Sequence, residues 1–374
     1  MFEIHGIKLD EEFECECGKK HKVPIKRVVT KEKGIYSIPN IVDDLDLRGT
    51  ACIIHDKVTK EIAGNIIMET LAQNDIKVIE FITEGPYESE AKNAYNVLVK
   101  NDCKYAIAVG GGSVIDVGKL ASHKASIPFI SVPTALSHDG IASATASLIS
   151  EEGVKRSFKA KAPIAVVFDL KILKNSPKRM IIAGCADLLC KATSVKDWEL
   201  GRDELGEYYC PFIARLTLSS FHENIEFLRR GCEAEAIGEH ALTILKSSIA
   251  MLLFGSSRPN SGSEHLISHY LDTYYKTRAM HGEQVAIGTI LMSKYHSEYN
   301  QNWWDQEEFQ WYYMKSLLER VGFPMELSRL GIERNWVIEA LCKAHELRPE
   351  RYTILHKRSP SPTEASRLLS DVGF

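Results

Sequence analysis

The chain has 374 residues, of which 44% are hydrophobic and 26% charged, and its formal net charge is −4 at pH 7. This composition is typical of a soluble globular protein with room for two domains. The small negative charge gives no electrostatic basis for binding nucleic acid or an anionic membrane. No run of residues reaches the roughly 18 apolar positions that a membrane span needs. The nine cysteines, scattered along the chain, predict reduced thiols and a cytoplasmic location.

The first segment with chemical interest is CECGKKH, in which Cys15, Cys17 and His21 lie close together. A structural zinc site requires four closed ligands, and this segment offers three. We therefore favour a β-hairpin that turns around Gly18 over a metal site, with FEC and KVPI on either side of the turn.

Between residues 51 and 168, short β-branched runs alternate with longer helical patterns. The runs ACIIH, KVIEFIT and YAIAVG each precede a helix-like segment, and PFISV follows the last of these helices. Strands and helices that alternate at these lengths predict βαβ units and a parallel sheet. The sequence therefore predicts an α/β domain in the N-terminal half.

The pattern of predicted secondary structure changes after about residue 170. Long helical segments such as MIIAGCADLLCKATSVKDWEL and AIGEHALTILKSSIAMLLF replace the β runs, and their small residues suit close helix packing. We predict an α/β domain over residues 1–172 and an all-helical domain over residues 173–374. A ligand site is expected in the cleft between two such domains.

A glycine triplet, Gly110-Gly111-Gly112, ends a predicted buried strand and opens a helix. Exposed backbone N–H groups at a helix N-terminus bind anions, and glycine allows a pyrophosphate to approach closely. The next residue, Ser113, has the alternative role of a helix N-cap. A second polar loop, with Thr134, Ser137, His138, Asp139 and Ser143, follows the next strand. Both loops are predicted at the carboxyl edge of the sheet, where open α/β folds bind ligands, and they indicate a nucleotide site.

Three histidines and one aspartate of the helical half form a candidate metal site. His265 and His269 are four residues apart, so they project from one helical face, and His281 opens the next helical segment. Asp187 lies in a small, apolar helix, where an unpaired charge would be costly. Two histidines and one carboxylate would leave a coordination position open, as in catalytic sites. The alternative, a salt-bridged Asp187 with unrelated histidines, stays open at this point.

Six segments, taken together, resemble one known family. They are GGGSVIDVGKLAS, FISVPTALSHDGIASA, GCAD, GSSRPNSGSEHLISH, HGEQVAIGT and AHELRPERYTIL. They resemble the sn-glycerol-1-phosphate dehydrogenases, in the wider group of iron-containing alcohol dehydrogenases, glycerol dehydrogenases and dehydroquinate synthases. The resemblance runs from about residue 34 to the C-terminus and leaves residues 1–33 as a possible N-terminal extension. It implies a parallel nucleotide-binding sheet followed by an all-α metal- and substrate-binding domain.

The resemblance also implies roles for individual residues. Asp187, His265 and His281 would bind one divalent metal, zinc in the first instance, with iron or nickel as alternatives. His269, Asp139 and Asp187 would contact the substrate and act as catalytic residues. Residues that would hold NAD or NADP are the glycine loop and its neighbours: Gly110, Gly111, Gly112, Ser113, Val114, Ile115, Asp116, Thr134, Ser137 and Ser143. Asp56, after the first of these strands, is either a ribose partner or an N-cap.

Basic residues bear on whether the substrate carries a phosphate. Arg258, beside Ser256 and Ser257, is a candidate phosphate contact through charge-assisted hydrogen bonds, or a structural arginine paired with a carboxylate. Arg348 and Arg351 in RPERYTIL are a second basic candidate, for which a structural role is favoured.

The resemblance predicts a metal-dependent enzyme that reduces dihydroxyacetone phosphate to sn-glycerol 1-phosphate with NAD(P)H, as a homodimer. One alternative is a glycerol or polyol dehydrogenase acting on an unphosphorylated substrate. Another is a dehydroquinate synthase-like lyase, although that relative usually has glutamate where this chain has Asp187. The sequence leaves open the choice between NAD and NADP and the identity of the metal.

Overall fold

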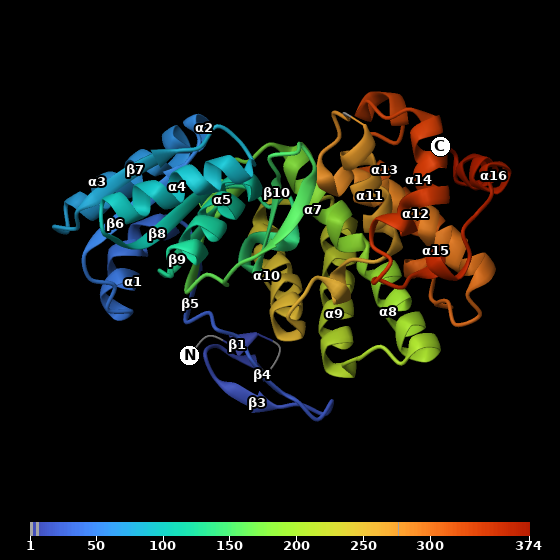
Figure 1. Ribbon diagram of the computed structural model, residues 1–374, viewed down its shortest axis with the longest axis horizontal. Coiled ribbons are helices and arrows are strands. Elements are labelled where there is room, and N and C mark those ends of the chain that lie inside the picture. Colours follow the sequence, from blue (N-terminus) through green and yellow to red (C-terminus); the bar gives the residue numbers. More distant parts are fainter. Residues whose placement is uncertain (1–2, 5–6, 276) are drawn as a thin grey trace. The chain divides into compact units, whose positions relative to one another are not determined.

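The computed structural model describes residues 3–4, 7–275 and 277–374 (Figure 1). Its contacts divide the chain into two compact units, each of which is discontinuous in sequence. The first comprises Met1–Glu14, Lys20–Met180 and Ala234–Gly255, and the second comprises Cys15–Lys19, Ile181–Glu233 and Ser256–Phe374. This division differs from a single boundary after residue 172, because one helix of the C-terminal half belongs to the first unit.

The first unit is built on a six-stranded sheet of order β5-β12-β9-β8-β6-β7, in which every neighbouring pair is parallel. The strands are β5 (Arg27–Lys31), β12 (Ala165–Asp169), β9 (Phe129–Pro133), β8 (Cys103–Gly110), β6 (Thr50–His55) and β7 (Val78–Ile82). The inner strands β8, β9 and β12 are buried along nearly their whole length. They read as continuous apolar runs because a parallel sheet is covered on both faces.

Helices and helical turns accompany this sheet. They are η1 (Gly34–Ser37), α1 (Ile38–Asp44), α2 (Lys57–Thr59), η2 (Lys60–Gly64), α3 (Asn65–Ala72), α4 (Glu88–Lys100), α5 (Gly112–Lys124), η3 (Asp139–Ala142), α6 (Leu170–Lys174), η4 (Ala234–Ala236) and α10 (Ile237–Phe254). Ile67 and Leu71 of α3 join Ile53, Ile107 and Val109 of the strands in one hydrophobic core. Helix α3 therefore buries its apolar face against the sheet.

Residues 27–31 form a strand that the sequence analysis missed. They lie inside the predicted extension of residues 1–33, yet β5 pairs with β12 in register, with Val28 opposite Val166. The segment RVVTK is short and only half-buried, because β5 lies at the edge of the sheet. A run this short, without a following βα pattern, gave little signal in the sequence.

Three antiparallel hairpins complete the β structure of the described chain. They are β1 (Glu3–Ile4) with β2 (Ile7–Lys8), β3 (Glu12–Glu14) with β4 (Lys20–Lys22), and β10 (Thr145–Ile149) with β11 (Lys155–Lys159). The hairpin predicted at CECGKKH is confirmed. Gly18 in its turn has a φ of +80°, a left-handed conformation that glycine adopts without a steric cost.

The second unit contains helices and helical turns throughout its described residues. They are α7 (Lys178–Leu189), α8 (Lys191–Leu205), α9 (Pro211–Arg229), η5 (Arg258–Asn260), α11 (Ser263–Tyr274), α12 (His281–Tyr299), η6 (Glu307–Phe309), α13 (Trp311–Val321), η7 (Leu327–Leu330), α14 (Arg334–Lys343), η8 (Ala344–Leu347), α15 (Ile354–Lys357) and α16 (Pro362–Val372). Together with the parallel sheet of the first unit, they confirm the predicted fold class.

Glycines allow α12 to approach α7 and α11 closely. A Cβ atom at Gly282 would lie 1.9 Å from the backbone oxygen of Ala183, and one at Gly288 would lie 2.7 Å from that of Glu264. Both distances are far below van der Waals contact, so a larger residue would force the helices apart. Gly282 and Gly288, which the sequence analysis did not single out, thus set the spacing of the three helices that carry the predicted metal ligands.

A buried aspartate fixes several helices of this unit. Asp197 on α8 is fully buried, and its Oδ2 accepts a 2.6 Å hydrogen bond from the backbone N–H of Ser263. Its Oδ1 accepts a 2.7 Å bond from the N–H of Ile354 and lies 3.2 Å from Nε2 of His296. This carboxylate joins the starts of α11 and α15 to α8 and α12, and so holds the helical framework around the site.

The segment Ala234–Phe254, which contains α10, is long and apolar enough to cross a membrane, but 72% of its most apolar window is buried inside the protein. Helix α10 contacts η3, α6 and β5 of the first unit. A helix that is apolar on all sides is typical either of a membrane span or of the core of a large protein, and this burial favours the core.

Candidate functional site

The predicted metal ligands come together in the second unit. Asp187 lies near the end of α7, His265 in the first turn of α11, and His281 is the first residue of α12. One ligand atom from each lies within 4.8 Å of the others, and Nε2 of His265 is 3.6 Å from Oδ1 of Asp187. Asp187 is only 1% exposed. These distances suit three donors that share one cation, which would also compensate a buried carboxylate.

Neighbouring side chains orient both histidines. Nδ1 of His265 is 2.9 Å from a carboxylate oxygen of Glu264, so the carboxylate accepts the Nδ1 proton and Nε2 faces Asp187. Glu264 is itself buried and held by hydrogen bonds of 2.7 Å from the Thr193 hydroxyl and 2.6 Å from the Gly262 N–H. A carboxylate behind a histidine is the usual support of a metal ligand, because it fixes the tautomer and raises the basicity of the ring.

A hydroxyl performs the same function for His281. The Ser268 hydroxyl donates to Oε1 of Gln284 at 2.7 Å, so it accepts from Nδ1 of His281 at 3.2 Å. The Gln284 amide is oriented in turn, since its nitrogen donates to Asp272 and Thr277. Nδ1 of His281 therefore carries the proton, and Nε2 is the nitrogen with a lone pair for a metal.

Sequence analysis missed Glu264 and Ser268. The only signal for Glu264 was its position directly before His265. Neighbouring residues in a helix point in different directions, so sequence spacing did not indicate that its carboxylate returns to the ring. Ser268 lies 13 residues from the histidine that it contacts, and this contact depends on how α11 packs on α12.

His269 completes a group of three rings. It lies one turn after His265 on α11, with ring centroids 6.0 Å apart, and its ring stacks on that of His281 at 6.4 Å. His269 is partly exposed, whereas His265 is 7% exposed. The pair at positions i and i+4 thus shares one face of the helix, as predicted, and differs in burial.

The glycine loop lies in the first unit, between β8 and α5 (Figure 1). Gly111 is the residue that precedes the helix, so the interpretation of Ser113 as an N-cap is wrong; Ser113 is an exposed residue of the first helical turn. A Cβ atom at Gly111 would meet nothing within 4 Å. The N-terminus of α5 therefore presents backbone N–H groups beside open space, which is the arrangement of an anion site.

A histidine of the second loop lies against this glycine loop. A Cβ atom at Gly112 would lie 1.8 Å from Nε2 of His138, so a larger residue at position 112 would displace the His138 ring. Nδ1 of His138 accepts a 2.8 Å hydrogen bond from the Gly140 N–H, while Nε2 is buried and has no hydrogen-bond partner among the described residues. The backbone of Thr134 also donates to Gly110, at 3.0 Å. The two predicted loops are thus adjacent, as expected at one edge of the sheet.

Several predicted cofactor residues take part in internal contacts. Asp116 binds the buried Lys119 at 2.8 Å and accepts a 2.8 Å bond from the Ser147 N–H. The Ser143 hydroxyl lies 3.3 Å from the same Lys119 ammonium. The side chains of Val114 and Ile115 are buried, so only their backbones are available to a ligand. Ser137 is partly exposed at the same loop.

Asp139 is 8% exposed and begins η3. Its carboxylate accepts a 2.7 Å hydrogen bond from the Ser247 hydroxyl, and its backbone oxygen accepts one from the Ser248 hydroxyl. Both serines belong to α10, which is part of the first unit. The contact spans more than 100 residues of sequence, so it could not be found from motif spacing.

Asp56 has the N-cap role that the sequence analysis left open. It precedes α2, and its Oδ1 accepts a 2.7 Å hydrogen bond from the Thr59 N–H. The Thr59 hydroxyl oxygen accepts a 3.1 Å hydrogen bond from the Asp56 N–H, which completes a capping box. Contact with a ribose stays a prediction.

Arg258 also has the structural role that was its alternative. Its guanidinium donates two 2.8 Å hydrogen bonds to the carboxylate of Glu207. Its Nη2 also donates a 2.7 Å hydrogen bond to the backbone oxygen of Tyr352. It is 3% exposed. A bidentate ion pair between a buried arginine and a partly buried carboxylate fixes the loop that precedes α11. A direct phosphate contact of Arg258 gains no support from it.

The other two predicted arginines are close to Arg258. Burial, together with the charges of Arg348 and Arg258, lowers the pKa of Arg351 to about 9. Burial also lowers the pKa of Arg348. Arg351 donates to the Ser257 hydroxyl at 3.1 Å and to the backbone oxygen of Ser261 at 3.0 Å, both neutral acceptors. Like charges at a partly buried place repel one another, and the carboxylates of Glu207 and Glu350 offset part of this repulsion at Arg351.

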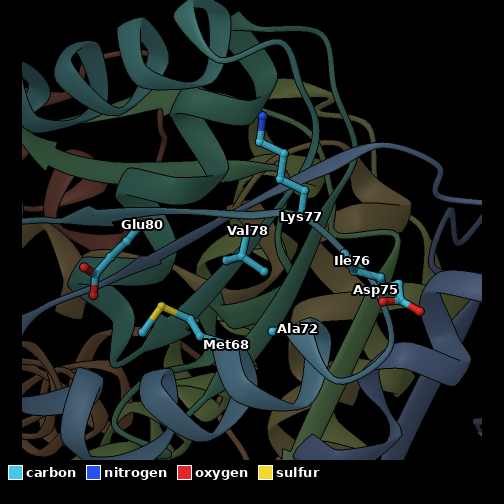
Figure 2. Close-up of a pocket in the computed structure, with 7 residues that line it drawn as sticks. All are labelled: Met68, Ala72, Asp75, Ile76, Lys77, Val78 and Glu80. Carbon is cyan, nitrogen blue, oxygen red and sulfur yellow. The ribbon is translucent and has the colours of Figure 1, made fainter.

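A separate hollow of about 540 Å³ is lined by Met68, Ala72, Asp75, Ile76, Lys77, Val78 and Glu80 (Figure 2). Its lining comes from α3, from β7 and from the loop that joins them. Most of these residues precede or begin β7, whereas ligands in open α/β sheets bind at the carboxyl ends of strands. The hollow holds none of the predicted site residues.

Residues 29–177 match the family model of the iron-containing alcohol dehydrogenases. A solved structure described as a probable glycerol dehydrogenase from Sinorhizobium meliloti has the same fold, with a TM-score of 0.71 at 18% identity over 93% of this chain and 96% of that one. The fold is therefore that of the iron-containing alcohol dehydrogenase group.

Two curated relatives are much more similar in sequence. A glycerol-1-phosphate dehydrogenase of Pyrococcus horikoshii is 39% identical over 351 residues, which are 93% of this chain and 97% of the relative. Its counterpart in Thermococcus kodakarensis is 39% identical over 335 residues, 89% of this chain and 92% of the relative. Both names give NAD(P)+ as the cofactor. The chain belongs to the glycerol-1-phosphate dehydrogenase family.

Proposed function

We propose that this protein reduces dihydroxyacetone phosphate to sn-glycerol 1-phosphate with NAD(P)H and one divalent metal ion. The observation that carries the proposal is the cluster of Asp187, His265 and His281, with ligand atoms within 4.8 Å of one another, in a chain of this family. The substrate is the one implied by the names of the relatives and by the resemblance of the sequence.

The cluster fits a metal of the zinc, iron or nickel class. Two imidazoles and one carboxylate are donors that such ions accept, and three protein ligands leave a position for substrate. Zinc is the ion we favour, as in the sequence analysis. A metal held there supplies Lewis acidity toward a carbonyl oxygen.

The chain's own groups prepare this centre. Glu264 and Ser268 hold Nδ1 of His265 and His281 in the protonated form, so that both Nε2 atoms are donors toward the ion. His269 lies beside both rings and is partly exposed, which suits it to hold a proton near the oxygen of the reacting carbon. Asp139, held by Ser247, is the proposed acceptor for a substrate hydroxyl.

The nucleotide is assigned to the glycine loop. Backbone N–H groups at the start of α5, with Gly111 beside open space and Gly112 under His138, would bind the pyrophosphate. The nicotinamide supplies the hydride. Thr134 and Ser137 remain the candidate polar contacts of the adjacent loop. Asp116 and Ser143 would not contact the nucleotide directly. They would hold this loop in position through their contacts with Lys119.

The phosphate of the substrate is assigned to Arg348 and Arg351. Burial first, and then the charges of Arg348 and Arg258, lower the pKa of Arg351, and a phosphate dianion would stabilise the charged guanidinium against both. Guanidinium groups bind phosphate through paired, charge-assisted hydrogen bonds. Arg258 would hold Tyr352, the neighbour of Arg351, in position. This moves the phosphate contact proposed for Arg258 to the second basic segment.

The test compares dihydroxyacetone phosphate with dihydroxyacetone, for the wild type and for Arg351→Gln. We expect turnover of the phosphate, with a product that a glycerol-3-phosphate dehydrogenase cannot oxidise. Loss of one charge-assisted interaction should raise the KM for the phosphate by about 10- to 100-fold, with any slow reaction of dihydroxyacetone unchanged. The control is Arg320→Gln, an exposed arginine on α13.

Two results would contradict the proposal. Turnover of dihydroxyacetone alone would favour a polyol dehydrogenase. Absence of net NAD(P)H oxidation, in protein that contains its metal, would favour a dehydroquinate synthase-like lyase. A homodimer in the cytoplasm, as the resemblance implies, is part of the proposal, and the mass of the purified protein in solution tests the dimer.

A further inference from the structure

The tip of the β3–β4 hairpin gathers three metal-binding side chains. Cys15 and Cys17 lie in the turn, and His21 lies on the returning strand opposite Phe13. The turn is closed by hydrogen bonds from the Cys15 N–H to the Lys19 oxygen at 3.0 Å and from the Gly18 N–H to the Cys15 oxygen at 2.9 Å. A short loop of this kind brings its side chains together locally, without long-range packing.

A fourth ligand reaches this turn from 195 residues further along the chain. Cys210 directly precedes α9, and its Sγ lies 3.6 Å from Sγ of Cys15. Cys15, Cys17 and Cys210 belong to the second unit, whereas His21 is tied to the two hairpin cysteines locally, since it lies four residues after Cys17 on the returning strand of the same hairpin. The segment before α9 is fixed, since the Trp198 indole donates to the Tyr208 oxygen at 2.8 Å and the Arg215 side chain pairs with Glu16.

The spacing of these atoms is that of a metal site. One ligand atom from each of Cys15, Cys17, His21 and Cys210 lies within 4.8 Å of all the others. Two sulfurs bound about 2.3 Å from a tetrahedral zinc ion are about 3.8 Å apart, close to the 3.6 Å between Cys15 and Cys210. A disulfide requires about 2.05 Å, and no disulfide joins any of the nine cysteines, all of which the structure describes.

A hydroxyl and an ammonium group lie close to the turn. The Tyr208 hydroxyl donates to Sγ of Cys17 at 3.1 Å, and the Lys19 ammonium lies 3.3 Å above the Tyr208 ring. Cys210 is fully buried and begins a 19-residue helix, whose N-terminus favours negative charge. His21 is 7% exposed. These are the outer contacts that a sulfur-rich site needs to orient its ligands.

We propose that Cys15, Cys17, His21 and Cys210 bind a structural zinc ion. Three thiolates and one imidazole are a closed, tetrahedral ligand set with no position for substrate, and they select a soft or borderline ion. The ion fixes residues 15–21 to the start of α9. The site shares no residue with the Asp187 cluster, so it stands whether or not the proposed reaction is correct.

The experiment uses the full-length protein, purified under reducing conditions, and measures zinc per chain. The zinc is then replaced by Co²⁺, because a tetrahedral cobalt ion with thiolate ligands shows a sulfur-to-metal charge-transfer absorption. The Asp187, His265 and His281 cluster has no sulfur ligand. We expect the charge-transfer band in the wild type and in the control Cys342→Ser. Cys17→Ser should show no band and should contain one metal ion per chain fewer than the wild type.

His21→Cys keeps the number of ligands, so it tests the site even where Cys17→Ser does not fold. It should retain the ion and increase the charge-transfer absorption. Absence of the band in cobalt-loaded wild type would overturn the proposal, as would unchanged metal content and absorption in Cys17→Ser. A Cys15–Cys210 disulfide, detected by mass after alkylation without reduction, would also overturn it.

Discussion

Two of the candidate ligand clusters in the described part of the chain, the Asp187 cluster and the cysteine cluster, differ in number of ligands, chemistry and support. The Asp187 cluster offers three candidate ligands, carried by α7, α11 and α12, and their donor atoms are nitrogen and oxygen. The cysteine cluster has four ligands, mostly sulfur, carried by a hairpin and the residue before α9. Three ligands leave a position for substrate, whereas four close the coordination sphere. The number of ligand atoms thus distinguishes the proposed catalytic metal site, which has an open coordination position, from the proposed structural zinc site, which has none.

The source of rigidity differs in the same way. Helices set far apart in sequence carry the Asp187 cluster, and Gly282 and Gly288 permit their close approach. Glu264 then fixes His265 at 2.9 Å. In the cysteine cluster, by contrast, the bound ion itself would supply the order, because a short hairpin has little core of its own. The following variants test this difference.

The largest effect is expected for Asp187→Ala. Removal of one of three ligands should abolish metal binding at that centre, and the Lewis acid contribution is worth several kcal/mol, or about a thousandfold in kcat/KM. The change is measured by steady-state kinetics and metal analysis. The cysteine-bound ion and the thermal midpoint should change little, and Asp203→Ala, an exposed aspartate, is the control. Full activity with normal metal content would remove Asp187 from the site.

A smaller effect is expected for Glu264→Gln. The amide cannot accept the Nδ1 proton of His265 as strongly as the carboxylate, and loss of such support typically weakens metal affinity by about 10- to 100-fold. Competition with a chelator measures the affinity. The distinction between the clusters would weaken if this variant released the thiolate-bound ion instead.

Cys17→Ser should lower the stability of the protein and leave its catalytic rate nearly unchanged. Loss of the ion should lower the thermal midpoint by roughly 5–10 °C, as expected for a few kcal/mol in a domain of this size, while kcat of the folded protein stays within about twofold of the wild type. Differential scanning calorimetry and kinetics at 25 °C provide the two measurements. A large fall in kcat at an unchanged midpoint would contradict the separation of roles.

The smallest effect is expected for Tyr208→Phe. This change removes the hydroxyl that donates a 3.1 Å hydrogen bond to Sγ of Cys17. A single hydrogen bond of this kind contributes about 1 kcal/mol, so the midpoint should fall by only about 2–4 °C and the zinc should stay bound. Tyr312→Phe, at an exposed tyrosine of α13, is the matched control. Complete metal loss would show that the hydroxyl is itself needed for binding.

Local patterns of the sequence predicted much of this molecule. The alternation of apolar runs and helical segments predicted the parallel sheet, and β5 was missed because RVVTK is short and lies at the sheet edge. The six family segments predicted Asp187, His265 and His281, which the structure brings together. Such features depend on periodicity and on short motifs, and both are properties of residues that are close together in the sequence.

Tertiary structure alone decided the contacts between distant segments. It placed Glu264 and Ser268 behind the two histidines and paired Arg258 with Glu207. It also brought Cys210 to Cys15 across 195 residues, which turned an incomplete set of three ligands into four. A sequence shows which donors exist, but their number at one point in space depends on how the helices and the hairpin pack. That packing separates an open centre from a closed one.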